Sequence, residues 1–311
     1  MSLFTEQQAT AADWRSFREG HPQVEVLDAF IIDVNGQPVG KRLRVEDAAA
    51  LFVDGLNFSA CAPLLDCRGL GHEPSGLGGA DGDPDATAWP VAGTLVAVPW
   101  SRVPAAQVLL SMAGAEQSEP WWDPRELLRH VVVRLARDGL FPVVACELEF
   151  YLLRPAGVAD GTSPEWTPAA GLGRAANLSL DNLEGTSEVL EGIHAAACRQ
   201  GIPTSTTVSE CGQGQFEVNL RHRADPVRAA DDAVLLRRIV RGVARQHGLR
   251  ATFMAKPFSR EPGSGLHVHA SIADATSANR FGAAEGERWL RGAIGGLQQS
   301  LAELLALLAP N

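Results

Sequence analysis

Polar and apolar side chains alternate in three short segments of this chain, and such alternation is typical of β-strands with one buried face. The segments are 146–150 (CELEF), 210–217 (ECGQGQFE) and 263–269 (GSGLHVH). Residues i and i+2 of an extended strand point to the same side. Glu147 and Glu149 are therefore predicted to project together, and so are His267 and His269, while their apolar neighbours pack behind.

These segments bring together four carboxylates, from Glu147, Glu149, Glu210 and Glu217, and an imidazole. Such groups cannot all stay charged and buried unless cations neutralise them. Ligation dominated by oxygen suits Mg²⁺ or Mn²⁺, the usual partners of nucleotide phosphates. The pattern predicts a metal-dependent enzyme that uses ATP.

Each motif also has a simpler interpretation. Two glutamates spaced by one residue often lie on a solvated edge strand, the glycine-rich segment could be a hairpin with two exposed acids, and a histidine in a strand is often a core residue. Apolar residues on both sides of 146–150 favour a central strand whose acidic face lines a cavity.

The composition fits a globular protein of about two domains. The chain has 311 residues, with 45% apolar and 21% charged side chains. A formal net charge of −10 without a run of Lys or Arg argues against a nucleic-acid partner. The five cysteines are scattered without a CxxC pair, which favours free thiols in a reducing compartment.

The N-terminal residues show no secretory signal, and no apolar run reaches the ~18 residues of a membrane-spanning helix. We therefore expect a cytoplasmic protein with no membrane partner.

Local signals predict a small β-rich domain at the N-terminus. Residues 27–34 are expected to form a strand, Asn35 and Gly36 a type I′ turn, and residues 37–45 the returning strand. Residues 69–93, rich in Gly, Pro and Asp, are expected to form a long loop. Two more short strands are predicted at 94–99 and 107–112, and the domain boundary is placed between residues 115 and 116.

Helix start and stop signals are clear in the second half. Asp123 and Pro124 precede a predicted helix over 125–138, and Asp225 and Pro226 precede one that ends at Gly248. The remaining predictions are helices at 187–200 and 285–308, strands at 143–153, 204–221, 251–257 and 266–272, and a surface loop at 165–176. This order predicts an α+β fold.

The joint order of the motifs is more specific than any one of them. The two glutamates of 146–150, the E-x-G-x-G-Q-x-E segment, and Lys256 and Pro257 followed by G-S-G-x-H-x-H resemble the glutamine synthetase family over nearly the whole chain. Within that family, the chain resembles the γ-glutamyl-amide ligases that join glutamate to polyamines or other amines. The resemblance implies a small N-terminal β-grasp domain over 1–115. It also implies a catalytic domain over 116–311, with a curved antiparallel sheet flanked by helices.

The resemblance also implies a metal site of two ions, Mg²⁺ or Mn²⁺. One ion would be held by Glu149, Glu210 and Glu217. The second would be held by Glu147 and His267.

Substrate contacts follow from the same resemblance. His269, with Ser271 and Arg221, would meet the phosphates of ATP. The glycine turn with Gly263 and Gly265 would lie along the glutamate substrate.

The implied reaction has two steps, in which ATP phosphorylates the γ-carboxylate of glutamate and ammonia or an amine then displaces phosphate. Asp66 and Glu217 would be the catalytic residues, and Asp66 would bind and deprotonate the amine. Cations would neutralise the negative charge that gathers during phosphoryl transfer. Asp66 lies far in sequence from the other residues, so homo-oligomeric rings with shared active sites are expected.

Two departures from the family pattern affect these expectations. Pro262 stands where glutamine-forming members have an asparagine that contacts glutamate, so ammonia is only one candidate acceptor. Family members also continue past residue 311 into an arginine-rich segment with another metal-binding glutamate. A catalytically incompetent paralogue, acting as a structural or regulatory subunit, is therefore the alternative. A cupin-like metal-binding barrel is disfavoured by the long capped helices.

Overall fold

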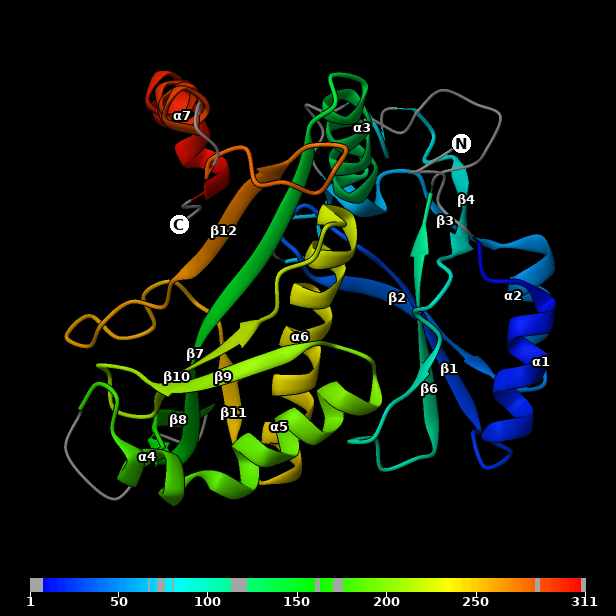
Figure 1. Ribbon diagram of the computed structural model, residues 1–311. Helices are drawn as coiled ribbons and strands as arrows, with labels where there is room; N and C mark the ends of the chain where they lie inside the picture. Colours follow the sequence, from blue (N-terminus) through cyan, green and yellow to red (C-terminus); the bar gives the residue numbers. More distant parts are fainter. Residues whose placement is uncertain are drawn as a thin grey trace. The chain divides into compact units, whose positions relative to one another are not determined.

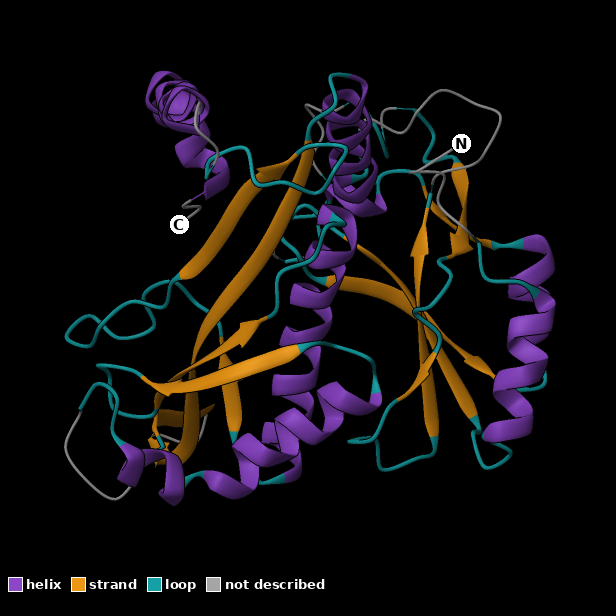
Figure 2. Cartoon of the chain, viewed as in Figure 1, coloured by secondary structure: helices purple, strands orange, loops and turns teal. Residues whose placement is uncertain are grey.

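The computed structural model describes residues 8–66, 68–71, 76–79, 81–112, 122–159, 163–169, 176–282 and 286–308. The chain divides into two compact units, Met1–Val133 and Arg134–Asn311. The predicted boundary between residues 115 and 116 lies outside the described residues. Helices and strands are both well represented, as expected for an α+β protein (Figures 1 and 2).

The first unit is built around a mixed sheet with strand order β2-β1-β6-β4-β3, in which β5 also pairs with β6. Strands β1 and β6 run parallel, and the other pairs are antiparallel. The elements are α1 (Ala11–Gly20), β1 (Val26–Ile32), β2 (Pro38–Arg44), α2 (Ala48–Asp54), β3 (Leu56–Ser59), a short 3₁₀ helix (Ala62–Leu64), β4 (Asp85–Pro90), β5 (Val96–Ala97) and β6 (Ala105–Ser111). The β-rich character predicted for the N-terminal part is confirmed.

Apolar side chains of the sheet and of the two helices form the core of this unit. Leu27, Ile31 and Val108 are almost fully buried. Trp14 of α1 stacks on Phe52 of α2, with 5.3 Å between the ring centroids. The helices are therefore held by burial of apolar surface, the main favourable term in folding.

The turn between β1 and β2 differs from the prediction. A type I′ turn needs positive φ at both central residues, but only Gly36 has it (φ 65°). The loop is longer because the carboxylate of Asp33 accepts hydrogen bonds from the backbone N–H groups of Asn35 (2.9 Å) and Gln37 (2.7 Å). The side chain of Asp33 thus competes with the hydrogen bonds between the two strands, and the turn is longer than the predicted two-residue turn.

The long loop predicted over 69–93 is wrong in its second part, because β4 occupies Asp85–Pro90. Ala86, Ala88 and Pro90 alternate along β4 and are buried or partly buried. Strand β3 pairs with the first part of β4, and β6 pairs with its end. Pairing with distant strands decides this segment, and no local signal reveals that pairing.

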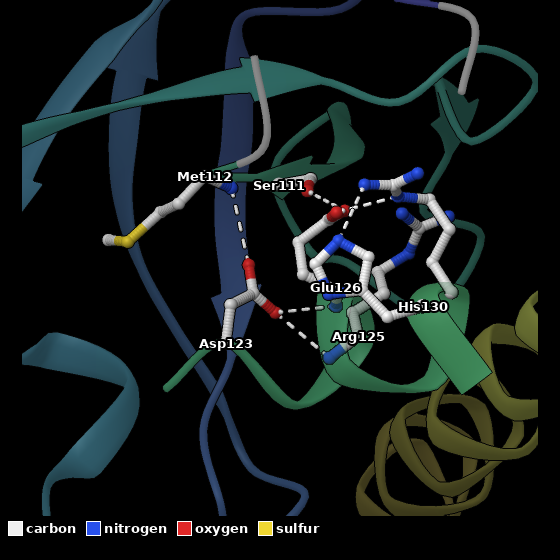
Figure 3. A network of polar contacts seen from close by, with 7 residues as sticks. Ser111, Met112, Asp123, Arg125, Glu126 and His130 are labelled. Carbon is white, nitrogen blue, oxygen red and sulfur yellow. Dashed lines mark hydrogen bonds and ion pairs between the residues drawn. The ribbon is translucent and has the colours of Figure 1, made fainter. Parts of the chain in front are cut away.

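Helix α3 (Pro124–Arg137) begins as predicted, with Asp123 at its N-terminus and Gly139 after its end (φ 71°). One oxygen of Asp123 accepts from the N–H groups of Arg125 (2.9 Å) and Glu126 (3.4 Å), and the other accepts from Met112 N–H (3.3 Å). Figure 3 shows that these contacts tie the start of α3 to the end of β6. Although the hydrogen bonds favour its charged form, burial raises the pKa of the Asp123 carboxyl.

Buried Glu126 lies in the same network. Its carboxylate accepts hydrogen bonds from Ser111 Oγ (3.1 Å) and from Arg129 Nε (2.6 Å). The buried charge of Glu126 is therefore paired with the guanidinium group of Arg129.

The second unit contains a sheet in which every strand pairing is antiparallel, and the 19-residue strand β7 (Phe141–Ala159) lies at its centre. Strand β7 pairs with β8 (Ser163–Pro168), β10 (Gln215–Leu220), β11 (Arg250–Thr252) and β12 (Leu266–Ala273), and β10 pairs with β9 (Thr204–Ser209). The helices are α4 (Leu180–Gly185), α5 (Ser187–Arg199), α6 (Pro226–Gln246) and α7 (Gly286–Leu308). The predicted helices at 187–200, from Pro226 and at 285–308 are confirmed, with ends shifted by one or two residues.

Two predictions in this unit are wrong in part. The surface loop expected at 165–176 contains β8, which pairs with the extended end of β7, while residues 170–175 lie outside the described residues. The strand expected at 251–257 is only three residues long, as β11 ends at Thr252. Pro257 cannot donate to a strand ladder, which fits this early end.

The free cysteines among the described residues are Cys61, Cys146, Cys198 and Cys211. None of the helices in the described part of the chain combines the length and the apolar character that crossing a bilayer requires.

Candidate metal centre

Three neighbouring strands of the second unit place the predicted acidic and histidine side chains next to one another. Strand β7 carries Glu147 and Glu149, and buried Leu148 and Phe150 alternate with them as predicted. In the sheet register, Glu217 of β10 lies opposite Glu149, and His267 of β12 lies opposite Glu147. The alternation read from the sequence therefore puts these groups on one face of the sheet.

The side chains form two overlapping groups of ligand atoms. In one group, oxygens of Glu149, Glu210 and Glu217 all lie within 4.8 Å of one another. In the other, oxygens of Glu147 and Glu217 and a ring nitrogen of His267 meet the same limit. Glu217 belongs to both groups and is only 7% exposed.

The distances around Glu147 show how the two histidines contact it. His267 Nδ1 lies 3.3 Å from Glu147 Oε2 and 3.9 Å from Glu217 Oε2. His269 Nε2 lies 3.1 Å from Glu147 Oε1. Burial alone would raise the pKa of Glu147, but the hydrogen bond and charge of His269, together with hydrogen bonds from Asn219 and His267, outweigh it and lower that pKa.

The other two acids show the opposite effect. Burial raises the pKa of Glu217, and the nearby charge of Glu147 raises it further. Burial, followed by the charge of Glu149, also raises the pKa of Glu210. Carboxylates that face one another across a sheet repel, so a divalent cation would relieve this repulsion.

Gln215 is the glutamine of the E-x-G-x-G-Q-x-E motif, and the sequence analysis predicted no role for it. Its amide nitrogen donates to Glu149 Oε2 and to the carbonyl of Gly263, each at 2.9 Å, and its amide oxygen accepts from Gly212 N–H at 2.9 Å. The buried side chain joins a metal-centre carboxylate to both glycine turns. It stands two residues before Glu217, so the alternation rule could have found it.

The glycine turn before β12 approaches the acidic side chains closely. The carbonyl of Gly265 accepts from Glu149 N–H at 3.2 Å. A Cβ at Gly265 would lie 3.0 Å from Glu149 Oε1 and 3.3 Å from His267 Nε2. Absence of a side chain here lets the turn pass beside the centre.

Pro262, which departs from the family pattern, contributes its carbonyl to this region. The hydroxyl of Tyr151 donates to Pro262 O at 2.7 Å. Burial, with the charges of Glu261 and Glu149, raises the pKa of Tyr151 to about 12, so this hydroxyl remains a donor.

A pocket of about 370 Å³ adjoins the centre. Its lining includes Glu147, Asn219, Arg221 and His269. Ser271 lies two residues beyond His269 on β12, on the same side of the strand. The pocket thus brings Arg221 and His269 beside the acids.

Asp66 and Lys256, which were also predicted to take part, form hydrogen bonds with residues outside the two ligand groups. Asp66 belongs to the first unit, where its carboxylate accepts from the N–H groups of Arg68 (2.8 Å) and Leu70 (2.9 Å). The bond from Leu70 and those from Arg68 lower the pKa of Asp66. Lys256 Nζ donates to the carbonyl of Glu261.

The donor set fits Mg²⁺ or Mn²⁺. Both groups are dominated by carboxylate oxygens, with one imidazole, and contain no thiolate. Hard divalent cations prefer such ligands, and burial together with neighbouring carboxylates raises the pKa values of Glu210 and Glu217.

Comparison with known proteins connects this geometry to a family. A family model described as the catalytic domain of glutamine synthetase matches residues 122–311. The chain is 36% identical over 302 residues to gamma-glutamylputrescine synthetase PuuA of Escherichia coli (strain K12), a match that covers 96% of this chain and 64% of that protein. It is 31% identical over 267 residues to glutamate–isopropylamine ligase of a Pseudomonas species, covering 84% of this chain and 56% of that protein.

A solved structure, the GmaS/ADP complex in conformation 1, is similar with a TM-score of 0.71 and 26% sequence identity. The match covers 88% of this chain and 58% of that one. The chain thus spans about three fifths of the length of the relatives it matches.

Proposed function

Because the chain belongs to the glutamine synthetase family, we propose that it forms γ-glutamyl amides from glutamate and an amine or ammonia, with ATP and Mg²⁺ or Mn²⁺. The observation that carries this proposal is the pair of overlapping ligand groups on β7, β10, β12 and the turn between β9 and β10, which holds Glu210. Two relatives named for γ-glutamylputrescine synthesis and glutamate–isopropylamine ligation support an amine as acceptor.

In this proposal the protein's own side chains hold the cations and position the nucleotide. Glu149, Glu210 and Glu217 would hold one divalent cation, and Glu147 and His267, together with Glu217, would hold the other. These ions would offset the negative charge that gathers between ATP and the substrate carboxylate.

The adjoining pocket suits the phosphates of ATP. Arg221 offers a fixed positive charge, and His269 and Ser271 offer hydrogen-bond donors. The turn with Gly263 and Gly265 would lie along glutamate, since its missing side chains leave backbone groups accessible.

The reaction then proceeds by two displacements. An oxygen of the glutamate γ-carboxylate forms a bond to the γ-phosphorus, and the bond to the ADP oxygen breaks. The amine nitrogen next forms a bond to the carbonyl carbon of the γ-glutamyl phosphate, phosphate leaves with the oxygen that joined it to that carbon, and the amine loses a proton. Asp66 would attract the protonated amine as a carboxylate and accept that proton.

A shared site between subunits of a ring would shield the acyl phosphate from water. The cytoplasmic location and the homo-oligomeric ring remain predictions.

Calorimetric titration with Mn²⁺ and with Mg²⁺–ATP, combined with a phosphate-release assay, tests the proposal. We expect both ligands to bind, and phosphate release to require glutamate together with putrescine, isopropylamine or ammonia. Glu149→Ala should abolish metal binding, whereas Glu191→Ala, on the exposed side of α5, should leave it unchanged. Equal metal binding by these two variants would contradict the metal centre.

The alternative, a catalytically incompetent subunit, gives a different result in the same assays. It predicts binding of metal and nucleotide without phosphate release for any amine. Turnover by the purified chain would exclude it.

A further inference from the structure

A second pocket, of about 820 Å³, lies in the second unit and has no part in the proposed reaction. Its walls come from the C-terminal half of α6, from β11 and from the segment after it, which includes Met254 and Phe258. Small-molecule sites typically measure about 300–1,000 Å³. The pocket is therefore large enough for a ligand of that class.

Arg241, Arg245 and Arg250 line this pocket, and Arg237 lies one helical turn before Arg241 on α6. Arg237, Arg241 and Arg245 are spaced by four residues along α6 and so share one face of the helix, and Arg250 begins β11. Burial, and then the charges of the other three, lowers the pKa of Arg241 to about 10. Positive charges of neighbouring arginines thus repel one another in this region, although the chain as a whole carries a formal charge of −10.

Aromatic rings position these guanidinium groups. The Cζ atoms of Arg237 and Arg241 each lie 5.4 Å from the centroid of the Phe253 ring. Arg250 Cζ lies 5.5 Å from the centroid of the Trp166 ring. Such cation–π contacts restrict the side chains before any ligand binds, which lowers the entropy lost on binding.

The rest of the lining is mainly apolar and includes Leu153, Met254, Pro257 and Phe258. No acidic residue is among the lining residues in the described part of the chain. An anion in the pocket would therefore meet guanidinium groups on one side and apolar surface on the other.

We propose that this pocket binds a small organic anion that carries at least two negative charges, on phosphate or carboxylate groups, attached to an apolar ring-sized portion. Guanidinium groups match the oxygens of both anions through paired N–H···O bonds. The apolar portion would lie against Met254 and Phe258. The lining of the pocket shares no residue with the two ligand groups, and the proposal does not depend on the ligase activity.

Isothermal titration with two probes in EDTA tests this site. The probes are 1-naphthyl phosphate and benzene-1,3,5-tricarboxylate, and EDTA prevents the acidic centre from taking up an anion through a metal ion. We expect saturable binding of at least one probe, with one site per chain, and the probe that binds more tightly identifies phosphate or carboxylate as the preferred group.

The variant Arg245→Ala/Arg250→Ala should weaken that binding by at least about tenfold, since hydrogen bonds between guanidinium groups and anionic oxygens would be lost. Both side chains are exposed, so the fold should persist, and circular dichroism checks it. Arg288→Ala, which removes an exposed arginine of α7, is the control and should bind normally. Failure of both probes to bind the wild-type chain, or equal affinity of the double variant and the control, would overturn the proposal.

Discussion

At the scale of single residues, Gln215 connects the candidate centre to both glycine turns, although no role was predicted for it. Its amide contacts Glu149, Gly212 and Gly263, three groups from separate segments. An acid needs such a partner to keep one rotamer when no cation is bound. Ligand geometry is therefore fixed by a neutral neighbour as well as by the strand register.

Replacement of Gln215 by leucine should weaken Mn²⁺ binding by about tenfold and lower the free energy of unfolding by about 2–4 kcal/mol, because three hydrogen bonds of about 1 kcal/mol each are lost and buried partners remain unpaired. Calorimetry and urea unfolding measure the two effects. Gln213→Leu, in the same turn, is the control and should change neither quantity much. Equal losses in the two variants would mean that Gln215 has no special role.

The acids and histidines could be predicted because the i, i+2 rule depends only on a strand being formed. Glu147, Glu149, Glu217 and His267 follow that rule. The contact of Gln215 with Gly263 could not be predicted in this way, since it joins residues 48 positions apart. Which strands lie beside β7 is decided by pairing across the whole unit.

At the scale of elements, helices with a strong start signal could be predicted, whereas α1, α2 and α4 were not predicted. The starts of α3 and α6 are set by Asp123 and Asp225, whose side chains accept from N–H groups two or three residues ahead. Those contacts are local and can be read from the sequence. Strand β4 is formed by pairing with the distant strands β3 and β6, and β8 by pairing with the extended end of β7, so the turn residues around them were interpreted as loops.

Removal of the cap by Asp123→Ala should lower the free energy of unfolding by about 1–2 kcal/mol through loss of the helix cap, with a further loss from the Met112 contact. Thermal unfolding followed by circular dichroism measures this. Asp138→Ala, beyond the end of α3, is the control. Equal stability of both variants would show that Asp123 does not anchor the helix.

Two glycines with similar backbone conformations should respond differently to alanine. Gly214 and Gly139 have φ of 72° and 71°, but only at Gly214 would a Cβ collide, 2.7 Å from Ala169 O. Gly139→Ala should cost about 1–2 kcal/mol from backbone strain alone. Gly214→Ala should cost more and weaken metal binding. A smaller loss at Gly214 in urea unfolding would contradict the close packing of this turn.

At the scale of the whole molecule, the acidic centre lowers stability in the absence of metal. The raised pKa of Glu217 means that its ionised form is less favourable in the folded chain than in the unfolded one. Glu217→Gln should therefore raise the melting temperature in EDTA.

Saturating Mn²⁺ should stabilise the wild-type chain by about 2.7 kcal/mol at a hundred times its dissociation constant. This increment should vanish in Glu217→Gln. Calorimetric melting with Mn²⁺ and with EDTA separates the two effects, and an unchanged increment in the variant would count against this residue as a ligand.

Apolar surface on β12 and α7 favours association between copies of the chain. Leu266 and Val268 of β12 are 61% and 60% exposed, and in the described residues β12 pairs along its length with β7 alone. Exposed apolar strand edges and patches promote contacts between molecules. Sedimentation should show assembly that increases with concentration, and Leu301→Lys in α7 should reduce it while Leu127→Lys in α3 should not. A monomer at all concentrations would contradict the expected rings.

Glu217 contributes to both ligand groups, and this sharing has a consequence for stoichiometry. An ion bound to this carboxylate in one ligand group would change the electrostatic potential for an ion in the other group. A titration should therefore reveal interdependent binding steps instead of two identical, independent ones. Any change that displaces this one side chain would empty both positions together.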